Sequence, residues 1–226
     1  MKPFLFDGIC LKNKRSSNMD SLLLKNVTVD NHDGLLAVVC DGVGSMADGA
    51  FASANAIRML DEWFGALETT ERIGLRLRDN VIKINTHIAI AAKAKRLDCA
   101  TTLSALLLLG DFYYIVHIGD SRIYSFDGIS LTMLTVDDIS QSGKLTTCVG
   151  RYEDIAPHYS EGSVDGKKFL ICSDGMYKKI DFDFLLSQMD FNNRREIRKA
   201  IKNIVEYVIT HGENDNISIA LVKTES

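Results

Sequence analysis

Apolar and polar positions follow two different periods along this 226-residue chain, and the change of period marks the expected elements. Two apolar stretches, 22–29 and 35–40, are joined by the turn-forming sequence Asp-Asn-His-Asp-Gly, which predicts an antiparallel hairpin. From residue 50 onward, apolar side chains recur every three or four positions, and they do so again after a break near Thr69. This spacing predicts two amphipathic helices, the second of them long.

Further apolar stretches follow, separated by Gly-Asp, Gly-Asp-Ser and Asp-Gly links. They predict a β-meander with strands at 101–109, 112–118, 122–126 and 129–134. Residues 135–164 are polar and weakly periodic. Beyond them, the pattern predicts a buried strand, a short helix, a longer helix and a last strand, at 168–172, 182–189, 197–208 and 216–222.

The strands come in hairpin blocks and the helices in consecutive pairs, with little strict β-α-β alternation. This order favours antiparallel sheets with helices packed outside. We therefore expect one α+β domain over residues 1–226, a four-layer α-β-β-α sandwich in which two antiparallel sheets are flanked by helix pairs.

Composition and charge indicate a folded soluble protein and exclude some classes of partner. The chain is 46% hydrophobic and 25% charged, which is ordinary for a folded soluble protein. A net charge of −4 gives no general attraction to nucleic acid or to an anionic membrane, so neither is an expected partner. No apolar stretch approaches the ~18 residues that span a bilayer, and the first residues lack a signal-peptide segment, so a cytoplasmic location is expected. The scattered cysteines, without C-x-x-C spacing, indicate reduced core residues.

Asp-Gly pairs occur seven times, and their sequence context separates two of them from the rest. Five, including Asp33-Gly34 and Asp127-Gly128, are expected to be turns. Asp41-Gly42 and Asp174-Gly175 instead follow nearly continuous apolar stretches directly. Both carboxylates are therefore expected at the ends of buried strands.

Two more aspartates have a similar setting, because Asp120 follows an apolar stretch and Asp215 precedes the last expected strand. If these ends converge, each pair of carboxylates repels by ~1 kcal/mol at 4 Å in water and by ~4 kcal/mol at an effective dielectric of 20. Hard cations such as Mg²⁺ or Mn²⁺ match a set of carboxylates and carbonyls, and Gly42 would let a carbonyl approach such an ion. Taken singly, each aspartate remains interpretable as a cap or turn residue.

Six short motifs occur in order along nearly the whole chain. They are R-S-S-N-M-D-S at 15–21, D-G-V-G at 41–44 with Gly49 and Ala52-Ser53, A-T-T-L at 100–103, G-D-S-R at 119–122, S-D-G-M at 173–176 and D-N-I-S at 215–218. In kind and order they resemble the motifs of the metal-dependent serine/threonine protein phosphatases of type 2C (PPM), in a short bacterial form. The resemblance implies a hydrolase that removes phosphate from phosphoserine and phosphothreonine in proteins.

The resemblance also implies a metal site for two Mn²⁺ or Mg²⁺ ions. Asp41 would bridge the two ions, and the carbonyl of Gly42 would complete the shell of one of them. Asp174 and Asp215 would bind the other ion, and Asp20 would support the site from its edge. A water shared by two cations ~3.5–4 Å apart loses a proton near neutral pH and can attack phosphorus in line.

A weaker third ion would lie at Asp120 together with Asp174, and Arg15 would grip the substrate phosphate as a planar bidentate donor. The catalytic residues implied are therefore Arg15, Asp41 and Asp174. Some eukaryotic relatives carry a histidine where this chain has Val43, so a metal-bound water is the expected proton donor.

The chain also departs from the family pattern. Met19 stands where Glu or Gln is usual and has no oxygen to offer a metal, Ser45 replaces a usual glycine, and Ala50 often is Glu. The region 135–149 is shorter than the usual flap subdomain. Met19 and the short flap motivate a rival hypothesis, a catalytically weak module that binds phosphoproteins or a kinase. A phosphatase for small metabolites is a third possibility that no sequence feature favours.

The expected partners are phosphorylated proteins and a cognate serine/threonine kinase, with the chain acting as a monomer in cytoplasmic signalling. Several basic or titratable residues have a simpler interpretation than function. For Arg122 we favour a structural role over contact with phosphate, and for His117 a hydrogen-bonded core position over metal binding. Lys12 and Lys14 would join Arg15 in a phosphate funnel or simply be solvated, and the basic positions within 194–202 favour a solvated helix face over a docking patch.

Overall fold

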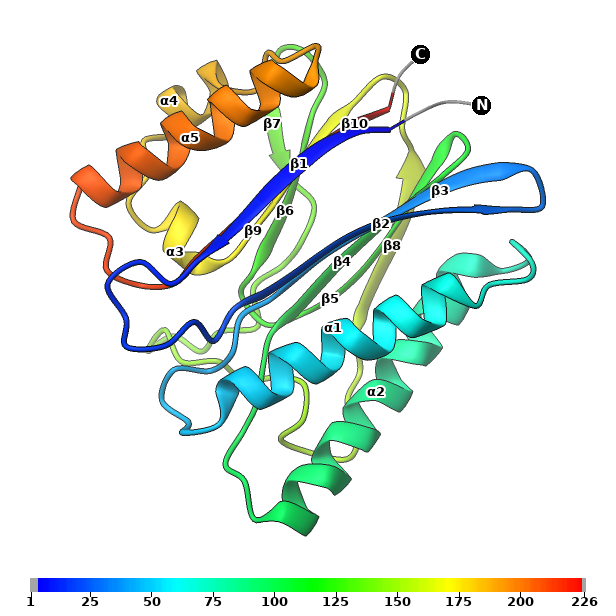
Figure 1. Ribbon diagram of the computed structural model, residues 1–226, viewed down its shortest axis with the longest axis vertical. Helices are drawn as coiled ribbons and strands as arrows, with labels where there is room; N and C mark the ends of the chain where they lie inside the picture. Colours follow the sequence, from blue (N-terminus) through cyan, green and yellow to red (C-terminus); the bar gives the residue numbers. More distant parts are fainter. Residues whose placement is uncertain (1–3, 225–226) are drawn as a thin grey trace.

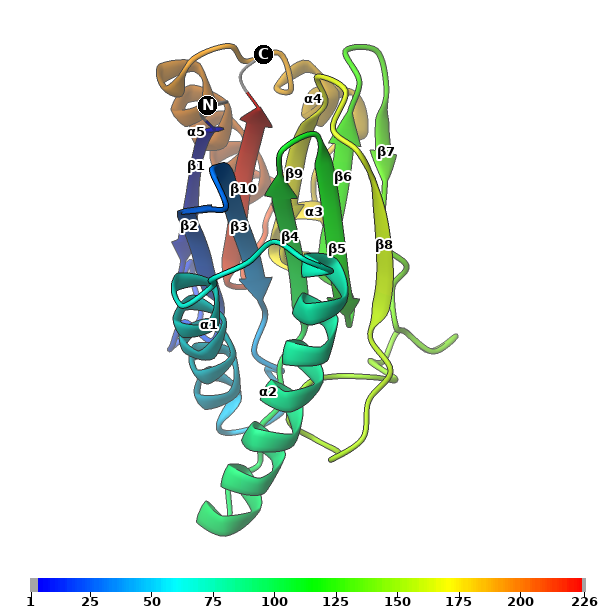
Figure 2. The same ribbon diagram turned by 90° about the vertical axis from the view of Figure 1, so that its right-hand side faces the viewer.

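Two antiparallel sheets of five strands face each other, and helices cover their outer faces (Figures 1 and 2). The computed structural model describes residues 4–224. Across one sheet the strands are β1 (Phe4–Leu11), β10 (Ile217–Thr224), β9 (Lys168–Cys172), β6 (Arg122–Phe126) and β7 (Leu131–Met133). Across the other they are β2 (Ser21–Val29), β3 (His32–Cys40), β4 (Leu103–Leu109), β5 (Phe112–Ile118) and β8 (His158–Ser163).

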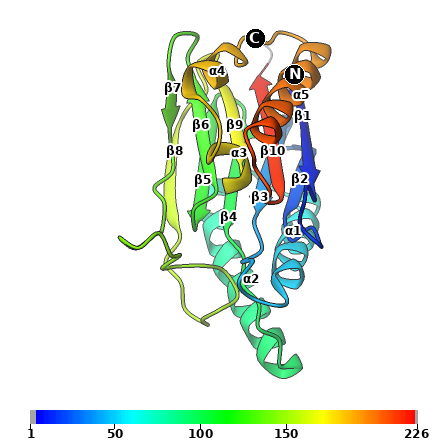
Figure 3. The ribbon, with the colours of Figure 1, turned by 90° about the vertical axis from the view of Figure 1, so that its left-hand side faces the viewer.

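The helices divide between the two outer faces, as the expected four-layer sandwich requires. Helices α1 (Gly49–Gly65) and α2 (Ile73–Lys95) cover the sheet that contains β2. Helices α3 (Asp174–Tyr177), α4 (Phe182–Ser187) and α5 (Arg194–Thr210) cover the sheet that contains β1 (Figure 3). The α+β class and the two antiparallel sheets are confirmed, and the second face carries a third, short helix in α3.

Strand β3 shows how the sequence builds two cores from one strand. Successive side chains of a strand point to opposite faces. Leu36 and Val38 therefore pack against the helical layer, whereas Leu35 and Ala37 pack between the sheets. The uninterrupted apolar stretch is the consequence of burial on both faces.

Three elements were not predicted, and each lacks a clear apolar period. Strand β1 mixes polar and apolar positions and is only half-buried, β8 is largely exposed, and α3 is a single short turn. The hairpin turn of β2 and β3 also lies earlier than expected, at Asp30 and Asn31, whose φ values are 50° and 61°. Asp33-Gly34 lies within β3, so its interpretation as a turn was wrong, whereas Asp127-Gly128 does join β6 to β7.

The predicted meander is divided between the two sheets. Strands β4 and β5 pair in one sheet, but β6 and β7 pair in the other. The chain crosses between them at Gly119, where φ is 103° and an added Cβ would lie 2.7 Å from the Thr102 side chain. Glycine is therefore required at this crossing.

The helices and the cysteines of the described residues complete the account of the fold. Within residues 4–224, no helix combines the length and the apolar character that crossing a membrane demands. All five cysteines carry free thiols, and four of them are buried, in agreement with the predicted core role.

Candidate active site

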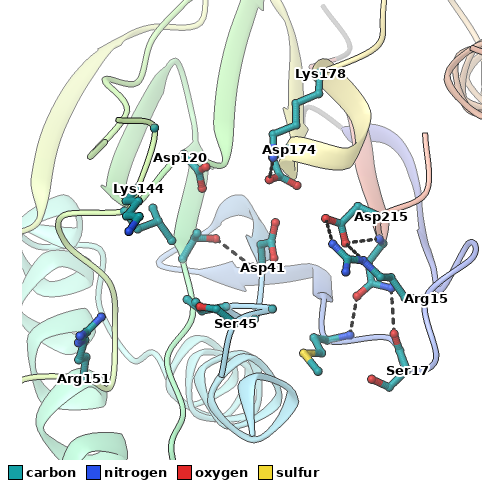
Figure 4. A pocket seen from close by; sticks show the side chains of 18 of the residues that line it. Arg15, Ser17, Asp41, Ser45, Asp120, Lys144, Arg151, Asp174, Lys178 and Asp215 are labelled. Carbon is teal, nitrogen blue, oxygen red and sulfur yellow. Dashed lines mark hydrogen bonds and ion pairs between the residues drawn. The ribbon is translucent and has the colours of Figure 1, made fainter. Parts of the chain in front are cut away.

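Carboxylates from both sheets converge on one pocket of about 810 Å³ at the end of the sandwich. Those that line it are Asp41, Asp120, Asp174 and Asp215. Asp41 follows β3, Asp120 lies between β5 and β6, Asp174 begins α3, and Asp215 precedes β10. Figure 4 shows their side chains around a common space, as the strand-end argument predicts.

Two threonines hold the backbone of Asp41 in place. Its N–H donates to Thr102 Oγ1 at 2.9 Å. Its carbonyl accepts the Thr102 N–H at 2.8 Å and the Thr101 hydroxyl at 2.9 Å. Thr102 Oγ1 also shares a 2.7 Å hydrogen bond with Ser121 Oγ, beside Asp120. The ends of β3, β4 and β6 are thereby fixed relative to one another.

Asp20 lies behind Asp41 and is 6% exposed. Its Oδ2 accepts hydrogen bonds from the hydroxyls of Ser173 and Ser218, both at 2.8 Å. Its buried Oδ1 has no hydrogen-bond donor among the described residues, and the carboxyl of Asp41 is an interacting neighbour. Burial first, and then the charge of Asp174, raises the pKa of Asp20 to about 6, against serine hydrogen bonds that lower it.

The other central carboxyls experience the same field. Burial raises the pKa of Asp41 well above its ordinary value, and the charges of Asp20, Asp174, Asp120 and Asp215 add to the rise. Burial and the charge of Asp174 likewise raise the pKa of Asp120 to about 6. Such a group of carboxyls must be neutralised by protons or by cations.

Arg15 makes a bidentate ion pair with Asp215, at 2.8 Å from Nε to Oδ1 and 2.6 Å from Nη2 to Oδ2. Burial opposes ionisation of Asp215, but the hydrogen bonds from Arg15 and from the Asn216 N–H outweigh it and lower its pKa. Arg15 remains 53% exposed, so its guanidinium is accessible to a ligand that enters the pocket.

The loop that carries Arg15 is clamped by the side chain of Asn216. Its Nδ2 donates to the carbonyls of Lys12 and Ser17, at 2.8 and 3.0 Å. Its Oδ1 accepts the N–H of Met19 at 2.8 Å. Position 19 thus contributes through its backbone N–H, which any residue except proline supplies. With methionine at this position, the site lacks only the side-chain oxygen that Glu or Gln would provide.

Lys178 forms an ion pair with Asp174 across one turn. As the side chains stand, no group of three or more His, Cys, Asp or Glu residues within 4–224 is arranged to hold a metal ion. In this arrangement Arg15 and Lys178 form ion pairs with Asp215 and Asp174. The carboxylates lie together, but two of them form ion pairs with the side chains of Arg15 and Lys178.

The donor set nevertheless fits hard divalent cations. All the converging groups are oxygens, and the unpartnered Asp20 Oδ1 lies behind them. The backbone at Gly42 is tightly enclosed, since an added Cβ would lie 2.6 Å from the Met19 carbonyl oxygen and 2.7 Å from the Gly49 backbone. Only glycine lets this segment approach so closely.

Other residues discussed from the sequence lie elsewhere. Arg122 binds Asp137, with Nη2 at 2.7 Å from Oδ2, and stacks on the ring of Tyr177 at 3.6 Å, which confirms its structural place. His117 is a buried core histidine, bonded to Ser104 Oγ and to a backbone carbonyl. Lys12 and Lys14 are not among the described residues that line the pocket.

Three residues that contribute to the site were not predicted from the sequence: Thr102, Asn216 and Lys178. The first two lie in the A-T-T-L and D-N-I-S motifs, and Asn216 also follows Asp215 directly, so membership of a motif was the available signal. The signal for Lys178 is weaker: it lies four residues after Asp174, and residues four apart lie on the same face of a helix.

The region predicted to hold a short flap forms one wall of the pocket. Between β7 and β8 the chain makes an isolated bridge, Ile139 with Leu145, around a tight turn. Lys144 and Arg151 from this segment line the pocket on the side away from Arg15 (Figure 4).

Comparisons with known proteins agree with this geometry. The family described as Protein phosphatase 2C matches residues 13–222. The serine/threonine phosphatase stp of Listeria welshimeri is 28% identical, over 83% of this chain and 84% of its own length. The serine/threonine protein phosphatase PstP of Mycobacterium tuberculosis is 24% identical over 86% of this chain, which spans 42% of that protein.

Solved structures share the fold. A crystal structure of the catalytic domain of the serine threonine protein phosphatase PstP, in complex with two manganese ions, has a TM-score of 0.85 at 22% identity and covers 100% of both chains. The serine/threonine phosphatase Stp1 of Staphylococcus aureus has a TM-score of 0.87 at 19% identity, over 100% of this chain and 96% of its own.

Proposed function

This chain belongs to the protein phosphatase 2C family and is a metal-dependent serine/threonine phosphatase, and we propose that the aspartates of its pocket hold the catalytic Mn²⁺ or Mg²⁺ ions. The observation that carries this assignment is the convergence of four strand-end carboxylates around Asp41, whose pKa rises through burial and their charges. Residues 1–226 would then act as a single catalytic domain.

The proposed ligands have distinct roles. Asp41 and the carbonyl of Gly42 would hold one ion, and Asp41, Asp174 and Asp215 the other. Asp20 would orient Asp41 from behind, because its carboxyl interacts with that of Asp41 and its Oδ2 is fixed by two serines. Asp120 would be an outer ligand. When bound, two such ions supply a hydroxide near neutral pH for attack on the phosphorus of the substrate.

Arg15 is the proposed phosphate-binding residue. Its guanidinium already makes a bidentate pair with a carboxylate, and a phosphate presents the same geometry. The Asn216 clamp holds its loop at the pocket, so Arg15 can exchange Asp215 for the substrate without moving its backbone. Arg15 would thereby orient the phosphate over the carboxylates.

Phosphorylated proteins are the proposed substrates, and a cognate serine/threonine kinase the opposing enzyme. The open pocket and the exposed guanidinium of Arg15 support access by a peptide segment. We further propose that the enzyme acts as a monomer in the cytoplasm, where its net charge of −4 gives it no general attraction to an anionic membrane.

The test is turnover of a phosphothreonine peptide with and without Mn²⁺. Asp41→Asn keeps the shape of the side chain but removes its charge, so we expect loss of at least about a thousandfold in kcat/KM, roughly 4 kcal/mol. Asp48→Asn is the matched control, because Asp48 belongs to the other Asp-Gly pair of the same loop and its side chain accepts a hydrogen bond from the Asp98 N–H, which an asparagine oxygen can also accept. Equal turnover in a chelator would refute the proposal.

The rival function, a phosphopeptide-binding module, rests on Met19 and the short flap. Calorimetry separates the two. Binding of the phosphopeptide without metal-stimulated turnover would favour the rival, whereas turnover that needs both Mn²⁺ and Asp41 supports the phosphatase.

A further inference from the structure

The ammonium group of Lys178 lies inside the acidic site. Lys178 follows α3, four residues after Asp174, and its side chain returns across the turn to the Asp174 carboxylate (Figure 4). Both residues line the pocket. The side chain of Asp174 is 15% exposed and that of Lys178 is 51% exposed, so the ion pair remains in contact with solvent.

The surroundings of this ammonium are mostly negative. Burial opposes the charge on Lys178, but the hydrogen bond to Asp174 and the charges of Asp174, Asp120 and Asp215 raise its pKa. Tyr177 directly precedes Lys178, and its hydroxyl donates to the Asp120 carbonyl at 3.0 Å. This bond ties the segment that carries Lys178 to the segment that carries Asp120.

The charges in the pocket suggest a role for the Lys178 ammonium group. Two divalent cations would neutralise the four carboxylates that line the pocket. A phosphate monoester then brings about two negative charges near neutral pH. Arg15 and Lys178 supply two positive charges beside those carboxylates. Lys144 and Arg151 line the pocket but neither is an ion-pair partner of these aspartates.

We propose that Lys178 is a built-in cation of the site, whose ammonium takes the outer position between Asp174 and Asp120 that a third divalent ion would otherwise occupy. The inference rests on the proposed metal site and specifies how many ions it holds. An ammonium tethered one helical turn from its carboxylate competes with a free cation at high effective concentration. This chain would therefore bind two divalent ions, and Lys178 would supply the remaining charge.

The test is the stoichiometry and affinity of Mn²⁺ binding to the metal-free protein, measured by isothermal titration calorimetry and by the electron paramagnetic resonance signal of free Mn²⁺. In the unmodified protein we expect two ions. In Lys178→Met we expect a third ion, or binding of the weaker ion that is on the order of tenfold tighter, because a competing unit charge is removed.

Lys179→Met is the matched control, since Lys179 is the adjacent exposed lysine and it does not line the pocket. We expect it to bind Mn²⁺ as the unmodified protein does. Identical stoichiometry and affinity in Lys178→Met, three ions in the unmodified protein, or an equal change in Lys179→Met would each overturn the proposal. Failure of the proposed function would differ, because the metal-loaded unmodified protein would then not hydrolyse phosphopeptide at all.

Discussion

Replacing Asp20 by asparagine should stabilise the metal-free protein, although Asp20 belongs to the site. The pKa of Asp20 rises from 3.8 to about 6, mainly through burial. Because the folded protein holds this proton more tightly than the unfolded chain, its contribution to stability is complete below about pH 4 and is lost as pH rises through about 6. Above that pH the buried charge destabilises the fold by ~3 kcal/mol, at ~1.4 kcal/mol per pKa unit.

Asparagine preserves the geometry while it removes the charge. Its Oδ1 can accept the hydrogen bonds of Ser173 and Ser218, as Asp20 Oδ2 does now. Its Nδ2 would take the place of the buried Oδ1 that has no donor among the described residues, and it can donate to the carboxyl of Asp41. An amide donor next to the Asp41 carboxylate is attractive, whereas the two neighbouring carboxylates of Asp20 and Asp41 repel each other.

The assay is thermal unfolding in excess chelator at pH 5 and pH 8, followed by circular dichroism. At pH 8 we expect Asp20→Asn to melt about 6–12 °C above the unmodified protein, at roughly 2–4 °C per kcal/mol for a chain of this size. At pH 5 the difference should shrink, because Asp20 is then largely protonated. Asp48→Asn should show neither effect. A melting temperature of Asp20→Asn at or below that of the unmodified protein at pH 8 would refute the reasoning.

Two other substitutions test the frame around the site. In Gly175→Ala the new Cβ would lie 2.0 Å from the Asn216 carbonyl oxygen, so we expect stability to fall by at least about 2 kcal/mol in urea denaturation, together with turnover. Gly44→Ala, where nothing lies within 4 Å, should leave stability unchanged. Arg122→Lys loses the bidentate bonds to Asp137, so we expect about 1–3 kcal/mol less stability but less than a twofold change in KM for a phosphopeptide. A tenfold rise in KM at unchanged stability would contradict its structural place.

The acidic floor of the site follows from the sequence because its residues end strands. Asp41 and Asp174 come directly after short continuous apolar stretches, and such a stretch is typical of a strand that is buried on both faces. Their ends must lie at an edge of the sandwich, where polar groups can meet. The order of the six motifs along the chain indicated which of these acidic residues belong to one site.

The partners of those carboxylates do not follow from the sequence in the same way. The pairs of Arg15 with Asp215 and of Asn216 with Lys12 join residues about two hundred positions apart, and no periodic pattern records such contacts. Periodicity likewise assigns a face to each side chain of a strand but does not choose the neighbouring strand. For this reason the change of sheet at Gly119 was invisible, although the strands on either side of it were predicted.

Strand β10 lies inside its sheet, between β1 and β9, although it is formed by residues 217–224. Asp215 and the Asn216 clamp directly precede it. During synthesis, the growing chain on the ribosome therefore has β1 and β9 available but not the strand that joins them. Since domains generally fold as units, this one cannot close its sheet or gather the aspartates that line its pocket until β10 has left the exit tunnel. A nascent or prematurely ended chain without an accessible β10 would accordingly be unable to dephosphorylate its targets, and enzymatic activity would report that residues 217–224 have left the ribosome.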